Sequence, residues 1–322
     1  MELGLNAANP KAAQKNRRIY GFSIQNRDTY SLALEDPRGR NIAETAVARD
    51  LFTFDVGDGR QRANLEAAFG RFEKTLVAES RALLAALEAE EALPSSEMLQ
   101  RLFVAKFLNA LRSPFCVAKA LNTIGAAASF SPTDPDLRKA YSWAIAGRRP
   151  HRTRICDAFA LTSEEYDKWL TCLFMMLAVE VGEGRTVLET ALLDLFAASA
   201  WYALVYSHGG SSDEQVCVLS DRGFSELENS ASRFGVEFNV ASRAYVRFGF
   251  LDVASIVPGA VARHGVGMLT EGLSPEIRVI RGDLAALESY NQRSVYQAAR
   301  RVYAASAAPY GVALAHGRGD QR

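Results

Sequence analysis

The sequence of 322 residues has no excess of either charge, because 37 Lys and Arg stand against 37 Asp and Glu. This balance excludes a polybasic coat protein for nucleic acid and an acidic disordered tail. Long apolar runs are also missing: the longest, over 195–206, is too short for a bilayer span, which needs about 20 residues. Residues 1–18 lack the apolar segment of a signal peptide. We therefore expect a cytoplasmic protein that has no membrane partner.

Residues with specialised chemistry are sparse. The four histidines and four cysteines show neither His-Glu-x-x-His nor Cys-x-x-Cys spacing, so we expect no preformed metal site. A phosphate-binding glycine loop and the Gly-x-Ser-x-Gly elbow of common hydrolases are absent as well. The cysteines stand in apolar surroundings, which is typical of reduced thiols. We expect no resident cofactor and none of the common dinucleotide or hydrolase chemistries.

The 48% hydrophobic content is that of a packed globule, and its patterning predicts both strands and helices. Short alternating runs predict strands over 19–24, 30–34, 51–54, 201–206, 215–220 and 236–250. Apolar residues at helical spacing, with a capping box at Thr162 to Glu165, predict helices over 61–92, 97–111, 134–146, 169–181 and 283–308. We expect 19–24 to form a hairpin with 30–34, and 201–206 to form one with 215–220.

Strands, helices, strands and a closing helix follow one another along the chain, which predicts an α+β fold. The fold should be predominantly helical, with an antiparallel sheet built from strands of the N-terminal part and of the C-terminal half. We expect a single large domain over 1–322. The alternative is a β-containing start (1–60), a helical core (61–200), and strands plus the closing helix (201–322). Glycines over 257–272 predict a long loop.

The first candidate site is a pair of glutamates on the helix predicted after residue 61. Glu66 and Glu73 are seven residues apart and therefore share a helix face, with Gly70 between them. Paired carboxylates that are partly desolvated have separate pKa values, as acid and base catalysis requires. The alternative is that both side chains are solvated or pair with neighbouring cations such as Arg71 or Lys74.

Two further polar residues stand at the ends of predicted elements. Asp221 follows the strand predicted over 215–220, where a side chain is held by the sheet and still reaches solvent. The sequence Ser-Asp-Arg-Gly is also typical of an ordinary turn. Arg112 ends an apolar helix, so we expect it to pair with a buried carboxylate, and a structural ion pair explains it equally well.

The sharpest local charge is a run of arginines in an otherwise neutral chain. Arg148, Arg149, Arg152 and Arg154 fall within seven residues. They would suit the phosphates of a nucleic acid or nucleotide, or an acidic surface of another subunit.

A second cationic surface is predicted on the closing helix. Arg293, Tyr296, Arg300 and Tyr303 follow one another at steps of three and four and would line one face. Such a face can stack nucleobases, or its arginines can simply stack on its own tyrosines.

Several short motifs recur in one order along the chain. They are Arg49-Asp50-Leu51-Phe52-Thr53, Leu65-Glu66 with Glu73, Phe107 to Arg112-Ser113-Pro114, Leu219-Ser220-Asp221, and Asn291 with Tyr303. This order resembles the bacterial family known as domain of unknown function 4238, and the resemblance covers most of the chain. It implies that the family's recurring polar and aromatic positions correspond to Phe52, Glu66, Glu73, Arg112 and Asp221.

Two departures from the family pattern bear on activity. Family members usually begin with two histidines followed by proline, whereas Asn9-Pro10-Lys11 and its surroundings contain none. The family's Ser-Asp-Asn-Pro is Ser-Asp-Arg-Gly at 220–223. If the histidines serve as ligands or bases, their absence predicts loss of that activity or a truncated, divergent member.

Two functional hypotheses follow. In the first, the arginines bind an anionic partner, a nucleic acid or nucleotide, in the stress or phage-conflict setting that the resemblance implies; an oligomer or protein partner would fit too. In the second, Glu66, Glu73, Arg112 and Asp221 form a phosphodiester hydrolase that uses Mg²⁺ or Mn²⁺. The first is favoured, because a site of three carboxylates needs a metal and no local ligand spacing supports one.

Overall fold

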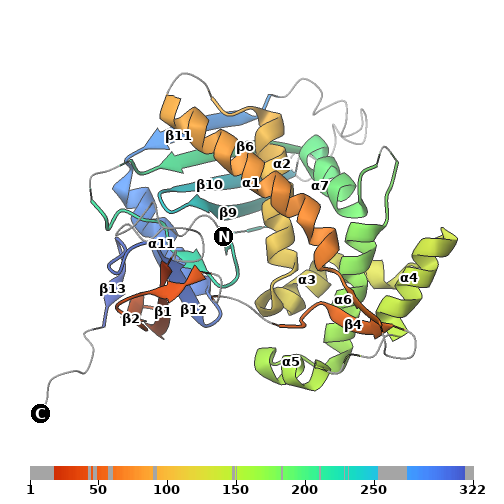
Figure 1. Ribbon diagram of the computed structural model, residues 1–322. Helices are drawn as coiled ribbons and strands as arrows, with labels where there is room; N and C mark the ends of the chain where they lie inside the picture. Colours follow the sequence, from red (N-terminus) through yellow and green to blue (C-terminus); the bar gives the residue numbers. More distant parts are fainter. Residues whose placement is uncertain are drawn as a thin grey trace, which may run out of the picture. The chain divides into compact units, whose positions relative to one another are not determined.

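The computed structural model has the α+β architecture that the order of elements predicts (Figure 1). It describes residues 18–42, 45, 49–56, 61–89, 93–146, 149, 151–182, 184–209, 212–227, 229–230, 232–252 and 274–315. The loop predicted over 257–272 lies outside these residues. None of the helices in the described ranges has the length and apolar content to cross a membrane.

The chain divides into two compact units. Unit 1 comprises Met1–Val47, Glu79–Leu99 and Phe196–Arg322, and unit 2 comprises Ala48–Ala78 and Gln100–Leu195. Three of the four divisions fall within helices, namely α1 (Glu66–Ala89), α2 (Ser96–Leu111) and α7 (Val187–Ala198), and the fourth lies between Val47 and Ala48.

Unit 1 contains a six-stranded sheet that joins the two ends of the chain. Its strands are β1 (Arg18–Asn26), β2 (Ser31–Leu34), β3 (Arg40–Asn41), β7 (Leu219–Ser220), β12 (Arg301–Ala304) and β13 (Ala313–Leu314). Their order is β13-β2-β1-β12-β7, and β3 also pairs with β1. β1 is antiparallel to β2 and to β12, with Ser23 opposite Arg301, whereas β13 is parallel to β2. The predicted sheet of N-terminal and C-terminal strands is therefore confirmed.

A second sheet of unit 1 has the order β11-β6-β10-β9-β8. Its strands are β6 (Ser199–Ser207), β8 (Ser225–Glu226), β9 (Arg233–Ala241), β10 (Ala244–Asp252) and β11 (Glu276–Arg281). The hairpin predicted between 201–206 and 215–220 is wrong. β6 pairs with β10 and β11, while β7 pairs with β12 of the other sheet. Alternation identifies a strand from local sequence, but the choice of partner depends on burial, and Val216 and Val218 are buried in the core of the six-stranded sheet.

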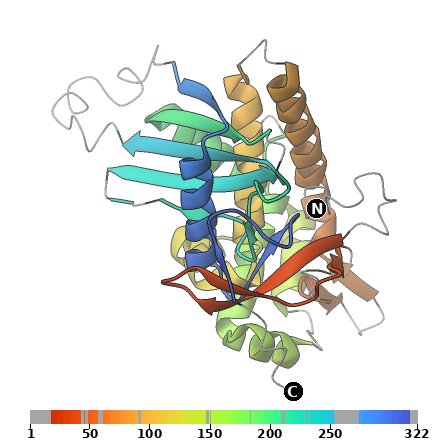
Figure 2. The same cartoon turned by 90° about the vertical axis from the view of Figure 1, so that its left-hand side faces the viewer.

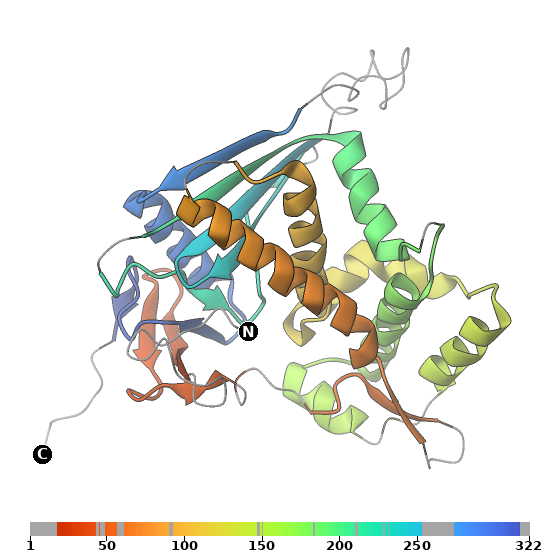
Figure 3. The same cartoon turned by 45° about the horizontal axis from the view of Figure 1, so that its top comes forward.

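Helix α11 (Leu284–Gln297) packs between these two sheets of unit 1, as Figure 2 and Figure 3 show. Asp283 caps it by accepting a hydrogen bond from the N–H of Ala286 at 2.9 Å. Val295 joins the core of the six-stranded sheet, and Leu287 and Tyr290 pack against Tyr206 and Tyr245 of the other sheet. The hydrophobic surface of α11 is thus shared between two cores.

The closing helix is shorter than predicted, because it ends at Gln297 and the chain continues as β12. The Asp221 carboxylate accepts the N–H groups of Ala299, Arg300 and Arg301, which an extended helix would have kept for itself. Arg27 donates to the carbonyl oxygens of Tyr296 and Ala299 at the same point. Tertiary contacts therefore override a local sequence that favours a helix.

Unit 2 is mainly helical and contains one small hairpin. Its elements are β4 (Thr53–Val56), β5 (Gln61–Asn64), η3 (Pro114–Cys116), α3 (Val117–Ile124), η4 (Gly125–Ser129), α4 (Pro135–Ala146), α5 (Arg152–Phe159) and α6 (Ser163–Ala178). The helix predicted from residue 61 begins instead at Glu66, where the Asn64 side chain accepts the N–H of Glu66 at 2.8 Å. The predicted capping box is confirmed by the reciprocal bonds between Thr162 and Glu165.

Helix α6 forms the centre of unit 2. Trp169 is fully buried and donates from Nε1 to the carbonyl of Leu111 at 2.7 Å, and Tyr166 donates from its hydroxyl to that of Leu51 at 2.6 Å. Phe52 packs with its ring centre 4.9 Å from that of Phe69 and 5.5 Å from that of Trp169. Phe52, which the resemblance singles out, is therefore a core residue of the structure.

The core of unit 1 contains a histidine whose substitution should raise stability. His208 is fully buried beside Tyr245, with ring centres 6.0 Å apart, and neither ring nitrogen has a hydrogen-bond partner within the part of the chain that the structure describes. A buried polar group without a partner costs about 1–3 kcal/mol. We expect His208→Phe to raise the free energy of unfolding by about 1 kcal/mol, measured by urea denaturation at neutral pH.

The same variant should change how stability depends on pH. Burial lowers the pKa of His208 from its ordinary 6.5, and the charge of Asp283 opposes this only in part. The unfolded chain therefore takes up a proton at this histidine at higher pH than the folded chain does. The free energy of unfolding is not reduced by this uptake above pH 6.5, and it decreases as the pH falls below 6.5. His208→Phe should remove this loss of stability at acidic pH. His151→Gln is the control, because it changes a half-exposed histidine and leaves His208 in place, so the loss should remain. Equal acid sensitivity in wild type and His208→Phe would contradict the prediction.

Candidate functional site

Three of the predicted catalytic residues lie together in unit 2. Arg112 Nη1 is 2.7 Å from Glu73 Oε1, and the Arg112 guanidinium lies 5.2 Å from the ring centre of Phe69. Burial raises the pKa of Glu66, with Arg112 lowering it and Glu73 raising it further. No atom lies within 4 Å of the place where a side chain on Gly70 would begin. The space above Gly70 is therefore open, and both glutamates lie on the exposed side of α1, with Glu73 paired as the alternative interpretation expects.

Asp221, the fourth predicted catalytic residue, lies in unit 1 and has a structural task. Its two carboxylate oxygens accept the N–H groups of Ala299, Arg300 and Arg301 at 2.7, 2.7 and 3.0 Å. These bonds fix the start of β12. Among the residues that the structure describes, no group of three or more His, Cys, Asp or Glu side chains is arranged to hold a metal ion.

The arginine run forms ion pairs within unit 2, so its charge is less available than the sequence suggests. Arg149, whose side chain is almost fully buried, and Arg152 bind the two carboxylate oxygens of Asp167 at 2.7 and 2.9 Å. Arg154 donates to the carbonyl of Arg49 at 3.0 Å. Arg148 lies outside the described residues. Arg149 and Arg152 are therefore already partnered within the protein, and binding of an anion by this run stays a prediction.

The second cationic surface is also divided. Arg293 and Tyr296 lie on α11, but Arg300 lies beyond the helix end and Tyr303 lies in β12. The predicted single helix face over all four residues is therefore wrong, because the helix stops at Gln297. Arg293 forms an ion pair with the fully buried Glu237.

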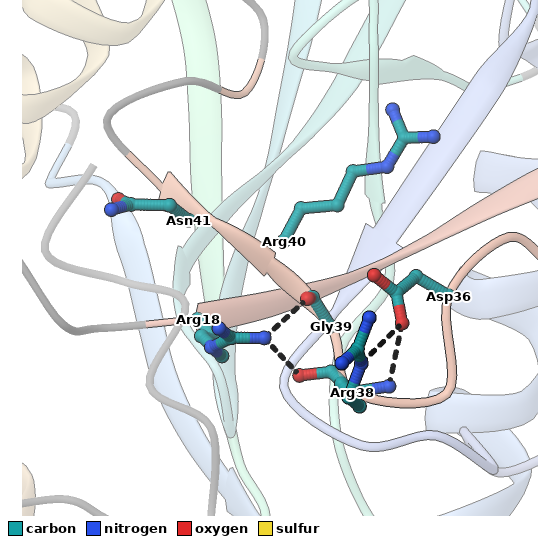
Figure 4. Close-up of a pocket in the computed structure, with 6 residues that line it drawn as sticks. All are labelled: Arg18, Asp36, Arg38, Gly39, Arg40 and Asn41. Carbon is teal, nitrogen blue, oxygen red and sulfur yellow. Dashed lines mark hydrogen bonds and ion pairs between the residues drawn. The ribbon is translucent and has the colours of Figure 1, made fainter.

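A cationic cavity that the sequence did not reveal lies at the β2–β3 turn of unit 1 (Figure 4). It has a volume of about 560 Å³ and is lined by Arg18, Asp36, Arg38, Gly39, Arg40 and Asn41. Three arginines against one aspartate give its wall a positive charge, although the whole chain is neutral. Such a wall attracts anions.

The turn sequence places these arginines. Asp36 Oδ1 accepts the N–H of Arg38 at 2.8 Å, and the N–H of Gly39 donates to the Asp36 carbonyl at 2.9 Å. Gly39 has a φ of +68°, which glycine adopts without strain, and a side chain there would begin 3.2 Å from the Ile19 carbonyl oxygen. The tight turn therefore brings its two flanking arginines to the end of β1.

The three arginines differ in how firmly they are held. Arg18 donates from Nη1 to the carbonyl oxygens of Arg38 and Gly39, both at 3.0 Å, so its guanidinium is fixed at the turn. The side chain of Arg38 is 86% exposed and lies 3.8 Å from Asp36. Figure 4 shows Arg18 and Arg38 at the turn, with Arg40 pointing away from them. The guanidinium of Arg18 is thus bound to the turn, whereas that of Arg38 is largely open to solvent and accessible to an anion.

A buried carboxylate positions the third arginine. Glu35, with only 12% of its side chain exposed, lies 3.0 Å from Arg40 and 2.7 Å from Arg301. Gly21 lies beneath it, because a side chain there would begin 3.3 Å from Glu35 Oε2. Burial raises the pKa of Tyr303, and the charges of Arg301, Asp221, Glu35 and Arg40 act on it as well. Asp221 accepts the N–H of Arg301, and the Arg301 side chain donates to Glu35, so Arg301 links the two carboxylates.

The cavity was missed because Arg18 is separated in sequence from Arg38 and Arg40 and comes from a different element. The turn at 36–39 is predicted by its Asp-Pro-Arg-Gly sequence, so the available signal was the pair of arginines that flank Gly39. Arg18 joins them only through the pairing of β1 with β3, in which it stands opposite Asn41.

The chain was compared with family models, with curated proteins and with solved structures, and no match was found in any of the three comparisons. Membership of the bacterial family that the sequence resembles therefore stays a prediction, and the site has to be interpreted from its own geometry.

Proposed function

We propose that this protein binds an anionic, phosphate-bearing ligand at the cavity lined by Arg18, Arg38 and Arg40. The observation that supports it most is the cavity itself, which is lined by three arginines and one aspartate, with Arg18 and Arg38 side by side at the turn. Guanidinium groups match the geometry of phosphate oxygens and form strong charge-assisted hydrogen bonds with them. Nucleotides and nucleic acids are the ligand classes that the sequence predicts, and a stress or phage-conflict role would be served by recognising either.

The position of the binding site differs from the one predicted from the arginine run. Arg149 and Arg152 already share Asp167, so a phosphate would have to displace a carboxylate to reach them. Arg38 has only a long contact with Asp36 and can turn toward a ligand at small cost. The β2–β3 turn is therefore the better candidate for the anion contact.

The proposal is tested by titrating the protein with inorganic pyrophosphate in a calorimeter at about 50 mM and 200 mM salt. We expect Arg38→Ala to weaken binding about tenfold, because it removes charge-assisted hydrogen bonds, and to reduce the dependence on salt. Its stability should stay within about 0.5 kcal/mol of wild type, since the side chain is exposed.

Arg278→Ala is the matched control, because Arg278 is an exposed, ion-paired arginine of the same unit that lies away from the cavity lining. It should bind pyrophosphate as the wild type does. Wild-type protein that fails to bind pyrophosphate at low salt, or equal affinities for Arg38→Ala and Arg278→Ala, would overturn the proposal.

A further inference from the structure

Unit 1 has a second cavity, of about 280 Å³, with a different chemical lining. Ser289, Gln292, Arg293 and Tyr296 contribute to it from α11, and Tyr30 contributes from the turn between β1 and β2. The four helix residues follow the spacing of three, four and seven that places side chains on one helix face. One wall is therefore a helix face that ends in an exposed tyrosine, and the other is the Tyr30 turn.

The backbone of Tyr30 is held in an unusual conformation. Its φ is +52°, a left-handed value that is uncommon for a bulky residue and costs about 1–3 kcal/mol. Its N–H donates to the Arg27 carbonyl at 3.3 Å, and its carbonyl accepts the N–H of Ala313 at 3.1 Å. Such strain persists where the surroundings enforce it, and it is concentrated at ligand sites. The ring is therefore presented by a turn whose geometry is fixed from both sides.

Arg27 joins the two walls of the cavity. Its guanidinium donates to the carbonyl oxygens of Tyr296 at 2.7 Å and of Ala299 at 2.9 Å, at the C-terminal end of α11. The β1–β2 turn is thereby attached to the end of the helix. Tyr30 and Tyr296 are positioned by this connection, so the space between the walls exists before any ligand arrives.

Several hydrogen-bonding groups of the lining have capacity that no residue in the described ranges uses. Gln292 uses Nε2 for Glu288 and Gly311, which leaves the acceptor Oε1, and Ser289 accepts from Arg293, which leaves its own proton to donate. The hydroxyls of Tyr30 and Tyr296 have no hydrogen-bond partner among the residues that the structure describes. Aromatic faces are thus combined with both donors and an acceptor.

We propose that this second cavity binds a nucleobase. Tyrosine rings stack on bases of any sequence, while the Gln292 amide oxygen and the Ser289 hydroxyl can bond the polar edge of a base. The charge of Arg293 is offset by Glu237, so the ligand needs no charge here, unlike at the arginine cavity. A volume just below the range of about 300–1,000 Å³ for sites of drug-sized ligands fits a single base. The base comes either from a free nucleoside or nucleotide or from a single-stranded nucleic acid.

The test uses adenosine, which has no phosphate and so reports on this cavity independently of the proposed anion site. We expect wild-type protein to bind adenosine in a calorimetric titration and Tyr296→Ala to weaken binding at least about fivefold, since stacking contributes about 1–3 kcal/mol per base. Tyr296→Phe keeps the ring and should stay within about twofold of wild type. Tyr296 is 54% exposed, so its replacement should leave the fold intact.

Arg38→Ala is the matched control, and it should bind adenosine as the wild type does even though it weakens pyrophosphate binding. Failure of wild type to bind millimolar adenosine, or equal affinity of Tyr296→Ala and wild type, would overturn the nucleobase site and leave the anion site untouched. A second titration uses a single-stranded oligodeoxyadenylate. Tighter binding that Tyr296→Ala weakens assigns the base to a single strand, and adenosine binding without oligonucleotide binding assigns it to a free nucleoside or nucleotide.

Discussion

Replacing Glu237 with alanine is expected to destabilise the protein by about 3–5 kcal/mol, the largest effect that we predict. Glu237 lies on β9 and is 0% exposed. One carboxylate oxygen lies 2.7 Å from Arg247, and the other binds Arg293 of α11. Its removal leaves two largely buried guanidinium groups without a counter-charge, which costs far more than the intact ion pairs contribute. The midpoint of urea denaturation, followed by circular dichroism, measures the loss.

Glu276 provides the matched control for this prediction. It belongs to β11 of the same sheet and also pairs with an arginine, Arg278, but both side chains are largely exposed. Exposed ion pairs contribute about 0–1 kcal/mol, so Glu276→Ala should shift the free energy of unfolding by no more than about 0.5 kcal/mol. Glu237→Gln keeps the shape and should still lose at least about 2 kcal/mol. If Glu237→Ala and Glu276→Ala were equally stable, the buried carboxylate would not be the connection between β9 and α11 that we infer.

Asp221→Ala should give the second largest loss, about 2–3 kcal/mol, because three backbone N–H groups lose their acceptor. Asp221→Asn should also be destabilising, since its NH₂ group cannot accept the N–H groups of Arg300 and Arg301 that Oδ2 accepts. Thermal unfolding of both variants measures the effect. If Asp221 has a structural role, its replacement lowers stability, whereas the replacement of a purely catalytic aspartate would leave stability unchanged.

The comparison for Asp221 is Asp213, another aspartate of unit 1 that is 78% exposed and 3.5 Å from Arg243. Asp213→Ala should unfold within about 0.5 kcal/mol of wild type. If Asp221→Ala were as stable as wild type, the role of Asp221 as acceptor of the three backbone N–H groups would be contradicted. Asp221 would then again be a candidate catalytic residue, as its position in the sequence suggests.

Local patterns in the sequence predicted elements better than they predicted partners. The apolar spacing after Glu66 and the Thr162 to Glu165 capping box are properties of neighbouring residues, and both helices are present. The strand at Leu219 was also recognised, but its pairing with β12 depends on residues far along the chain. The end of α11 at Gln297 was not predictable from the helix itself, because distant Asp221 takes up the N–H groups that follow it.

The candidate sites also differ in whether neighbouring or distant residues determine them. Helical spacing alone brought Glu66 and Glu73 to one face, and Arg112 pairs there with Glu73, an exposed carboxylate and not the buried one that was expected. Asp221 was recognised as a constrained carboxylate, but its role comes from the backbone of β12. The residues of the arginine cavity all lie within 18–41, but they meet only through the pairing of β1 with β3, which the local pattern does not specify. The arginine run looked available only because Asp167 lies on a different helix, α6.

The antiparallel pairing of β1 with β12 has a consequence for synthesis of the protein on the ribosome. β1 emerges well before its neighbour β12, because β1 ends at Asn26 and β12 begins only at Arg301. Contacts between such distant segments form late, because a very long stretch of polypeptide must first be closed into a loop. The hairpin of β1 and β2 therefore waits with an unpaired edge while most of the chain is made, a state in which chaperone protection against misassembly matters most.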